Sequence, residues 1–437
     1  MPVTLNIDDA DFEAGFQHML SAKREDSSDV NEAVAAIIAR VRAEGDAALC
    51  DLTARFDRLS LTPGTLRFSP DEIAAEVAKV GPEDRAALEL AADRIRAYHA
   101  RQIPEDASWT DAQGATLGWR WSAVSAAGLY VPGGQAAYPS SVLMNAIPAR
   151  VAGVERLVIC VPTPGGVINP LVMLAAQLSG VDEIYRIGGA QAVAAMAYGT
   201  GSIAPVDKIT GPGNAYVAAA KRQVFGRVGI DMIAGPSEVL VIADGDQNPD
   251  WLAWDLLAQA EHDADAQSIL ITTDADMARR VAAAVERIIP TLQRSAIAGA
   301  SWRDYGTLIV VRDLDQAAAL SNRIAPEHLE LCVADPEGLA AKCIHAGAIF
   351  LGAHTPEAVG DYVSGPNHVL PTARSARFSS GLSVMDFLKR TTMARLSPGA
   401  LAAIGPAAVR LAASEGLQAH GASVQARLEL LNERVGE

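Results

Sequence analysis

The sequence predicts an α/β fold with mostly parallel sheets, and three observations support this prediction. From about residue 115 onward, short apolar runs rich in Val, Ile and Leu alternate with helical stretches of about ten or more residues. Gly, Pro and Asn residues of the kind that form turns separate these stretches. The chain has 437 residues, of which 50% are hydrophobic and 20% charged, so it can bury a large core in more than one domain.

The first hundred residues are predicted to be helical. Amphipathic patterns run from Asp8 to Lys23, from Val30 to Glu44 and from Glu83 to Arg101. Ser69-Pro-Asp-Glu72 is a capping box that starts another helix. We find no cluster of reactive side chains in these helices, so we assign them a packing role.

The middle of the chain supplies the predicted sheets. The predicted strands cover 129–131, 157–161, 183–187, 239–243, 268–272 and 307–311. The predicted helices between them cover 141–152, 170–178, 190–198, 215–224 and 277–288. Residues 401–437 are rich in Ala and Leu and are predicted to form helices. They are too few to fold alone, so we expect them to pack on another part of the protein or on a second copy of the chain.

Composition excludes several classes of partner. The formal net charge of −16 and the absence of a basic stripe argue against nucleic acid or an anionic membrane surface as a partner. The sequence shows neither a signal peptide nor an apolar run long enough to span a bilayer. The four cysteines lie far apart without a CxxC motif, so we expect a reduced, cytoplasmic protein with inert thiols (Cys50, Cys160, Cys332 and Cys343).

The segment 235–262 carries a candidate site. A buried strand is predicted over 237–244, and Asn248-Pro249 is a typical helix start. Gln259 and His262 are three residues apart near the end of this helix, so they can share one face and reach one metal ion. The alternative is a capped surface helix in which His262, when charged, interacts with the helix dipole. The segment alone favours this alternative.

Three glycine-bearing turns follow predicted strands. In an open parallel sheet, ligands bind where strands end and helices begin, because free backbone N–H groups point outward there. The sequence contains neither GxGxxG nor GxxxxGK[ST], so a nucleotide site here must be atypical. Tight turns alone also explain the glycines, but not why Tyr130, Gln191 and Asn214 each lie at such a strand end. The turns are 130–134, 187–191 and 211–214.

Glu327 and His328 are adjacent candidates for acid–base catalysis. Neighbouring side chains on a regular strand point to opposite faces, so these two can share a site only on an irregular turn. Pro326 favours such a turn directly before a strand. Surface charge at a strand start is an equally well supported alternative.

Two further pairs of carboxylate and imidazole lie near the C-terminus. Asp361 and His368 flank a glycine-bearing turn, and Glu415 and His420 lie at a predicted helix start. A mononuclear Zn²⁺ site is compatible with four of these polar residues, although glutamine is an uncommon ligand. These four are Gln259, His262, Asp361 and His420.

Several sequence blocks follow one another in a characteristic order and spacing between about residue 30 and residue 430. The blocks are LYVPGG, IGGAQA, GPGN, DMIAGPSEVLVIAD, LLAQAEHD, PEHLEL, GDYVSGPNHVLPT, SSGLSVMDFLKRTT and EGLQAHGASV. In the order and spacing of these blocks the chain resembles the histidinol dehydrogenase family, and the number of blocks makes the resemblance specific. The resemblance implies oxidation of L-histidinol to L-histidine through bound L-histidinaldehyde, with NAD and one zinc ion per active site.

The resemblance also implies an architecture of two Rossmann-like lobes of an incomplete nucleotide-binding type, with helical N- and C-terminal extensions. We expect a catalytic lobe made of 29–127 and 237–380, and an NAD-binding lobe over 128–236. The expected extensions are 1–28 and 381–437, the second serving a homodimer with shared active sites.

Roles for individual residues follow from the same resemblance. The implied zinc ligands are Gln259, His262, Asp361 and His420, with His420 coming from the partner subunit. Glu327 and His328 match the acid–base pair, and Tyr130, Gln191 and Asn214 match the positions that hold NAD. The implied substrate contacts are Ser237, Gln259, His262, His328, Asp361, His368, Glu415 and His420.

A mechanism follows as a hypothesis. His328 is the candidate base for the alcohol, and zinc mainly orients the substrate. Because none of the four cysteines has the polar, cationic setting of a reactive thiol, we expect the aldehyde to be oxidised as its hydrate. Glu327 would then activate the water.

Three alternatives remain open at this stage. The first is a related zinc- and NAD-dependent dehydrogenase of another small polar alcohol. The second is a zinc hydrolase that uses Glu327 to activate water and has no NAD dependence. The third is a non-catalytic dimer stabilised by zinc, which would show a raised melting temperature with metal and no turnover.

Overall fold

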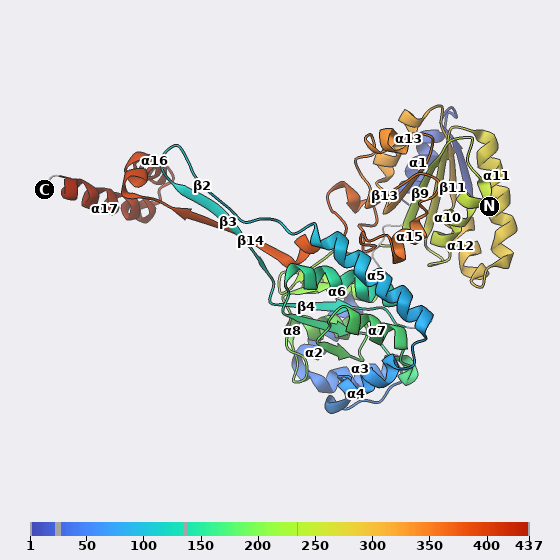
Figure 1. Ribbon diagram of the computed structural model, residues 1–437, viewed down its shortest axis with the longest axis horizontal. Coiled ribbons are helices and arrows are strands. Elements are labelled where there is room, and N and C mark those ends of the chain that lie inside the picture. The colour runs from blue at the N-terminus through green and yellow to red at the C-terminus, as the bar shows by residue number, and fades with distance from the viewer. Residues whose placement is uncertain (1, 22–27, 134–137, 234, 436–437) are drawn as a thin grey trace. The chain divides into compact units, whose positions relative to one another are not determined.

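The structure is a computed structural model that describes residues 2–21, 28–133, 138–233 and 235–435 (Figure 1). The chain forms two compact units, the first made of Met1–Gln102 with Val124–Phe387 and the second of Ile103–Ala123 with Leu388–Glu437. The first unit holds two parallel sheets and the second holds one antiparallel sheet. The predicted α/β class with mostly parallel sheets is therefore confirmed.

The first sheet has six parallel strands in the order β1-β11-β10-β9-β12-β13. Every residue of β9 is buried, because helices cover both faces of the sheet. Val239 and Val241 face one layer, whereas Leu240 and Ile242 face the other. The strands are β1 (Val3–Asn6), β9 (Glu238–Ala243), β10 (Gln267–Thr272), β11 (Thr307–Val310), β12 (His328–Cys332) and β13 (Ala348–Leu351).

Two helical layers enclose this sheet (Figure 1). One layer contains α10 (Pro249–Ala260), α11 (Ala275–Ile288) and α12 (Ser295–Tyr305). The other contains α1 (Phe12–Ser21), α13 (Leu314–Ile324) and α14 (Pro336–Ala340). The short helix α15 (Glu357–Tyr362) follows β13 and contacts α10.

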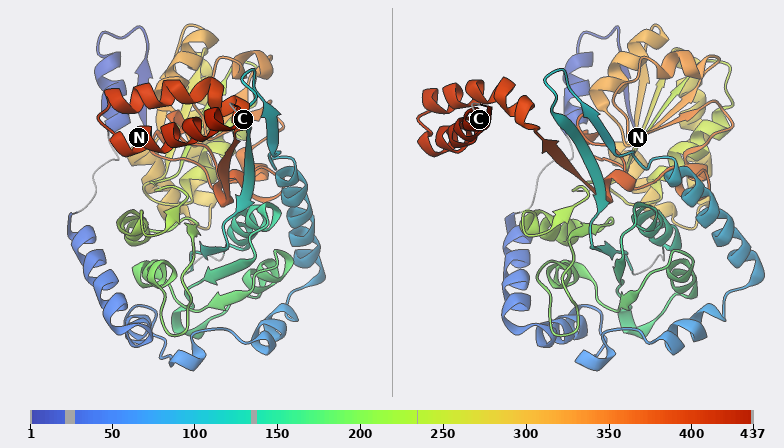
Figure 2. Two further views of the ribbon diagram at one scale, coloured as in Figure 1. Left: turned by 90° about the vertical axis from the view of Figure 1, so that its left-hand side faces the viewer. Right: turned by 60° about the vertical axis from the view of Figure 1, so that its left-hand side comes forward.

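The second sheet has five parallel strands in the order β6-β5-β4-β7-β8. Its strands are β4 (Ala126–Tyr130), β5 (Arg156–Cys160), β6 (Glu183–Tyr185), β7 (Lys208–Thr210) and β8 (Gly229–Ile230). One face packs against α2 (Ser28–Glu44), α3 (Asp46–Phe56), α8 (Gly189–Tyr198) and α9 (Ala215–Val224). The other side carries α6 (Pro139–Ala152) and α7 (Pro170–Leu178), against which α4 (Pro70–Val77) and α5 (Pro82–Ala100) pack (Figure 2).

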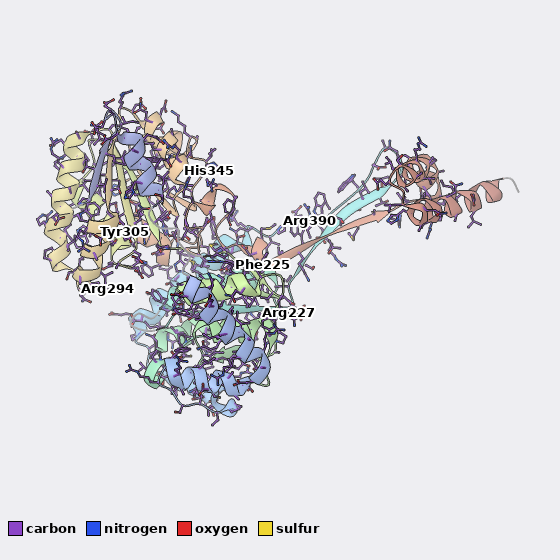
Figure 3. The ribbon with its side chains drawn as sticks, turned by 180° about the vertical axis from the view of Figure 1, so that it is seen from behind. Phe225, Arg227, Arg294, Tyr305, His345 and Arg390 are labelled. Carbon is purple, nitrogen blue, oxygen red and sulfur yellow. The ribbon has the colours of Figure 1, made fainter. Side chains whose placement is uncertain are left out.

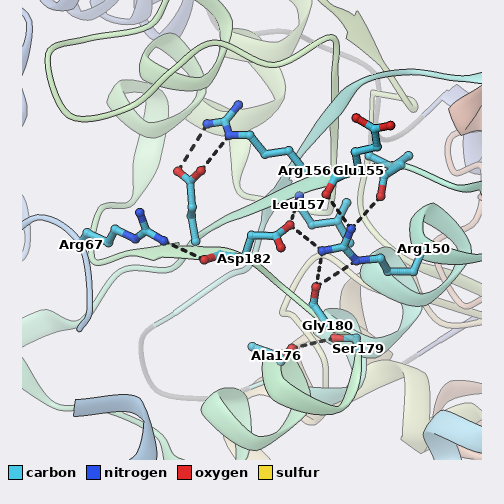
Figure 4. Close-up of polar contacts among 11 residues, drawn as sticks. Arg67, Arg150, Glu155, Arg156, Leu157, Ala176, Ser179, Gly180 and Asp182 are labelled. Atoms are coloured by element: carbon cyan, nitrogen blue, oxygen red, sulfur yellow. Dashed lines mark hydrogen bonds and ion pairs between the residues drawn. The ribbon is translucent and has the colours of Figure 1, made fainter. Parts of the chain in front are cut away.

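An arginine near the end of α6 secures the junction between this helix and its neighbours (Figure 4). Arg150 donates hydrogen bonds to the carbonyl groups of Val154, Glu155 and Gly180, and it forms an ion pair with Asp182. The Asp182 carboxylate in turn accepts a hydrogen bond from the Leu157 N–H of β5 at 2.7 Å. Side chains thus satisfy the peptide groups where helices meet strands.

The second unit contains an antiparallel sheet in the order β14-β3-β2 and two helices. Its elements are β2 (Ala107–Thr110), β3 (Thr116–Ala123), β14 (Leu388–Arg395), α16 (Pro398–Ser414) and α17 (Gln418–Val435). Short 3₁₀ helices elsewhere in the chain are Pro63–Thr65, Pro164–Gly166, Ile289–Thr291, Ser375–Arg377 and Val384–Phe387.

The structure corrects three expectations about organisation. The segment 1–28 is not purely helical, because Val3–Asn6 forms an edge strand paired with β11. The helices α2 and α3 pack on the five-stranded sheet of the expected NAD-binding lobe, so 29–127 does not belong to the catalytic lobe as a whole. The C-terminal segment is not purely helical either, because it contributes β14 to a sheet with β3.

No described helix is both long enough and apolar enough to cross a membrane.

Candidate active site

Glu327 directly precedes β12 and His328 is its first residue, and β12 lies between β9 and the edge strand β13 of the six-stranded sheet. Helix α13 ends in Ala325, whose φ of 50° places it in the left-handed region. Pro326 follows, and the Glu327 carbonyl accepts a hydrogen bond from Ala348 N–H at 3.0 Å. This irregular turn brings both side chains into one buried site, where His328 Nδ1 lies 3.8 Å from Glu327 Oε2. The predicted turn is confirmed, and the surface-charge alternative is wrong because both residues are buried.

The imidazole of His328 is held in one orientation. The residue is only 4% exposed, and its Nδ1 lies 3.2 Å from the Glu238 carbonyl oxygen. A carbonyl can only accept, so Nδ1 carries the proton and donates it, which leaves Nε2 with a lone pair. Among the described residues Nε2 has no hydrogen-bond partner, and Asp361 Oδ1 lies 3.9 Å from it. Burial lowers the pKa of His328 to about 4, so the ring is neutral at pH 7.

Glu327 has the environment of a strong proton acceptor. Its Oε2 accepts a hydrogen bond from Glu238 N–H at 3.0 Å. Burial raises the pKa of Glu327 well above its ordinary value, although this hydrogen bond acts in the opposite direction. A carboxylate with a raised pKa removes a proton from water more readily than an exposed one does.

Asp361 and His368 are brought together as their spacing suggested. His368 Nδ1 lies 3.0 Å from the Asp361 carbonyl oxygen and 3.9 Å from Asp361 Oδ1. The other ring nitrogen lies 3.4 Å from the Ser141 hydroxyl of α6, which is in position to donate to it. Asn367 fixes the preceding turn, because its side-chain amide donates to the Met144 carbonyl at 2.5 Å. His368 is therefore held between helices α15 and α6.

Gln259 and His262 lie at the end of α10. The predicted helix start is confirmed, because Asn248 caps α10 by accepting a hydrogen bond from Asp250 N–H at 2.9 Å. The helix ends at Ala260, so His262 lies in the following turn and not on the last helical face. Its N–H donates to the Gln259 carbonyl at 3.1 Å, and its own carbonyl accepts from Arg294, labelled in Figure 3.

The two side chains of this pair differ in burial. Gln259 is 1% exposed, and neither Oε1 nor Nε2 of its amide has a hydrogen-bond partner among the described residues. His262 is exposed. Burial lowers the pKa of His368, and the interaction with His262 lowers it further. A buried amide without a partner is costly and indicates a missing ligand.

The donor set around His328 suits a metal ion. His328, Glu357 and Asp361 each offer a ligand atom, and these atoms lie within 4.8 Å of one another. Imidazole nitrogen and carboxylate oxygen are ordinary zinc ligands, and Asp361 is the member of this group that was also expected from the sequence to bind zinc. Asp255, Glu330 and Cys332 form a second such group among the described residues.

Four acidic residues of this region were not predicted from the sequence. Glu238 orients His328 and Glu327 through its main chain, and Glu357 Oε1 lies 3.5 Å from His328 Nδ1. The Glu357 N–H donates to Glu330 at 2.6 Å, and Glu330 lies beside Asp255. A carboxylate within an apolar strand pattern, as in SEVLVIA and LELCV, could have indicated a buried functional acid, because carboxylates are rarely buried.

The predicted NAD residues gather at the carboxyl edge of the five-stranded sheet. Tyr130 ends β4, and its hydroxyl accepts a hydrogen bond from Gly189 N–H at 3.1 Å. Gln191 lies in the first turn of α8 and is buried. Asn214 is exposed and caps α9 by accepting from Tyr216 and Val217 N–H. Gly134 of the first glycine turn lies outside the described residues.

The remaining predicted residues are placed as follows. Ser237 is half-buried directly before β9, and its carbonyl accepts from Gln267 N–H at 3.0 Å. Glu415 ends α16 and His420 lies in the first turn of α17. Both belong to the second unit, and both are exposed.

The four cysteines are free, as expected. Burial raises the pKa of every one of these thiols. The thiolate form that a nucleophile needs is therefore disfavoured at each position.

Comparisons of the sequence and of the structure with known proteins identify the same family. The family model described as histidinol dehydrogenase matches residues 20–428. The histidinol dehydrogenase of Ruegeria pomeroyi is 73% identical over 99% of this chain and 100% of its own length. That of Rhodospirillum rubrum is 65% identical over 98% of this chain and 99% of its own. The crystal structure of histidinol dehydrogenase from Elizabethkingia anophelis superposes with a TM-score of 0.94 at 38% identity, covering 99% of both chains.

The buried carboxyl of Asp255 predicts a pH-dependent stability. Burial raises its pKa to about 6, whereas an unfolded aspartate has a pKa of about 3.9. The folded state therefore favours the proton, and the resulting stabilisation is present below about pH 4 and is lost as the pH rises through 6. Asp255→Asn is always neutral, so its melting temperature, measured with a chelator present, should rise relative to the parent between pH 4 and pH 8. The shift corresponds to about 2 to 3 kcal/mol if the whole pKa difference is realised.

The control is Asp246→Asn at an exposed position, which should follow the parent at every pH. Parallel melting curves for Asp255→Asn and the parent would show that Asp255 is ionised in the folded protein.

Proposed function

The chain belongs to the histidinol dehydrogenase family of oxidoreductases, and on that premise we propose that it oxidises L-histidinol to L-histidine through bound L-histidinaldehyde. We propose NAD as the hydride acceptor, one zinc ion per active site, and histidine biosynthesis in the cytoplasm as the role. The observation that carries this proposal is the neutral, buried imidazole of His328, which presents an unpartnered Nε2 beside Glu327 and Asp361.

The residues present fit a zinc ion. Gln259, His262 and Asp361 would hold it, and the buried Gln259 amide without a partner supports this assignment. When bound, zinc would act as a Lewis acid and orient the amine and imidazole of histidinol.

The strand-end loops around Tyr130, Gln191 and Asn214 fit a dinucleotide. They lie at the carboxyl edge of a parallel sheet, where helices α8 and α9 begin. NAD, when bound, would accept a hydride in each oxidation.

In the first oxidation His328 acts as the general base. Its Nε2 lone pair takes the hydroxyl proton of histidinol while a hydride leaves the adjacent carbon. The bond from Nδ1 to the Glu238 carbonyl keeps the ring in the tautomer that this step requires. Glu415, Ser237 and His368 are the proposed contacts to the polar groups of the substrate.

In the second oxidation water must add to the aldehyde before another hydride can leave. Glu327 takes a proton from this water while the water oxygen bonds to the aldehyde carbon. The aldehyde oxygen takes the proton that His328 gained in the first oxidation, which gives the hydrate and leaves His328 neutral again. His328 then takes a hydroxyl proton of the hydrate as the second hydride departs. The raised pKa of all four thiols favours this route over a covalent thioester route.

We propose that the site is shared within a homodimer. Gln259, His262 and Asp361 belong to the first unit, whereas Glu415 and His420 are exposed on the second. A second copy of the chain would supply His420 as the fourth zinc ligand and Glu415 as a partner for the substrate ammonium group.

Counting NADH formed per histidinol consumed tests the reaction directly. The proposal predicts two NADH per histidinol, loss of activity after complete chelation, and recovery with added zinc. One NADH per histidinol would show that oxidation stops at the aldehyde. Full activity without metal would end the zinc proposal, and turnover of another polar alcohol in place of histidinol would favour a related dehydrogenase.

Substitutions of the acid–base pair separate the two oxidations. His328→Asn should lower both rates by about a hundredfold to ten-thousandfold, because it removes the base of both steps. Glu327→Gln should lower oxidation of added histidinaldehyde more than oxidation of histidinol to the aldehyde, as followed by single-turnover absorbance of NADH.

His345→Asn, at the half-buried histidine labelled in Figure 3, and Glu337→Gln at an exposed position are the controls and should retain the parent rates. Normal turnover of His328→Asn would remove it as the base. Equal losses of both rates in Glu327→Gln would count against its role in water activation.

A further inference from the structure

Lys221 and Asp231 form a deeply buried ion pair in the lobe with the five-stranded sheet. Their side chains are 2% and 1% exposed, whereas pairs such as Arg279–Asp276 lie at the surface. Lys221 is on α9, and Asp231 directly follows β8. The chain turns between them at Phe225 and Arg227, which are labelled in Figure 3. A buried ion pair is weak evidence for stability, because desolvation of both charges offsets their attraction.

Both members of this pair bind main-chain groups of the same residue, Gly211. Lys221 Nζ donates a hydrogen bond to the Gly211 carbonyl at 3.0 Å. The Gly211 N–H donates to Asp231 Oδ2 at 2.8 Å. The donor and the acceptor of Gly211, which is itself buried, are therefore satisfied by charged side chains. Apolar side chains of similar size would fill the space but would leave both groups without partners.

Gly211 is held against the end of β4. Its φ is 113°, and a Cβ at this position would lie 2.1 Å from the Tyr130 carbonyl oxygen. Only glycine can occupy such a position, because the left-handed backbone and the close approach both exclude a side chain. The ion pair thus fixes the backbone at the point where the turn 211–214 leaves the sheet and passes Tyr130.

The same turn leads directly to Asn214. This residue caps α9, so the first turn of the helix and the loop before it form one continuous structure. Lys221 lies further along the same helix and reaches back to Gly211. The loop is therefore anchored at its beginning by the ion pair and at its end by the cap. Tyr130 and Asn214, the two proposed NAD contacts on either side of this anchor, depend on its shape.

We propose that Lys221 and Asp231 are positioning residues for NAD, which hold the 211–214 turn in the conformation that binds the dinucleotide. This inference rests on the proposed NAD dependence. In this proposal the buried ion pair affects how tightly the protein binds NAD. It has no part in the proton transfers at His328.

The double variant Lys221→Met with Asp231→Leu tests the inference. It removes both charges together, so no single buried charge is left behind. The KM for NAD should rise at least about tenfold, with the KM for histidinol and kcat at saturating NAD within about twofold of the parent. Circular dichroism and the melting temperature confirm folding. If the double variant does not fold, Lys221→Met with Asp231→Asn replaces it, because this variant also removes both charges but keeps an acceptor for Gly211 N–H. It removes the donor to the Gly211 carbonyl, so the KM for NAD should still rise.

The matched control is the ion pair Arg156–Glu183, which lies at the opposite edge of the same sheet. Arg156 starts β5 and Glu183 starts β6, and their charged atoms are 2.8 Å apart. Arg156→Met with Glu183→Leu should lower the melting temperature without raising the KM for NAD.

Two outcomes would overturn the inference. An unchanged KM for NAD in the folded double variant, or equal rises in the KM for NAD and histidinol, would show that the pair is only structural. If the parent itself does not reduce NAD, the proposed function fails first, so the two failures are distinguishable.

Discussion

The active site depends on the parallel pairing of β12 with β9, which places His328 opposite Val239 and its Nδ1 against the Glu238 carbonyl. Glu238 holds both members of the acid–base pair, since its N–H binds Glu327 and its carbonyl binds His328. A slip of one residue in this register would turn His328 to the opposite face of the sheet. The fully buried strand β9 prevents such a slip, because its alternating Val, Leu and Ile side chains fit two different helical layers.

The candidate site residues lie at opposite strand ends in the two parallel sheets. Tyr130, Gln191 and Asn214 lie at the carboxyl edge of the five-stranded sheet, as expected for ligands of open α/β sheets. Glu327, His328 and Ser237 lie instead at the amino edge of the six-stranded sheet, where their strands begin. Helix α10 runs back from the far end of β9, so Gln259 and His262 return to this same edge. His368 lies 3.4 Å from the Ser141 hydroxyl of α6, a helix that contacts β4 of the five-stranded sheet, and so connects the candidate site to that sheet through α6.

Local features of the chain could be predicted from the sequence, whereas long-range packing could not. Helix α10 with its Asn248 cap, the alternation of strands and helices, and the turn at Pro326 follow from local patterns. The edge strand Val3–Asn6 is too short to show periodicity and pairs with a strand about three hundred residues later. The same limit applies to β14, which pairs with β3 across the sequence. The positions of the buried acids Glu357 and Asp255 beside β12 could not be predicted from local patterns, because only the packing of α10 and α15 brings them there.

The proposed zinc site brings Gln259, His262 and Asp361 to one ion beside His328. Anomalous scattering at the zinc absorption edge, from crystals of the full chain grown with zinc and histidinol, tests it most directly. The account predicts one strong peak per chain among these three residues, with His420 of a second copy completing the site. A peak at the alternative group of Asp255, Glu330 and Cys332, with none beside His328, would contradict it.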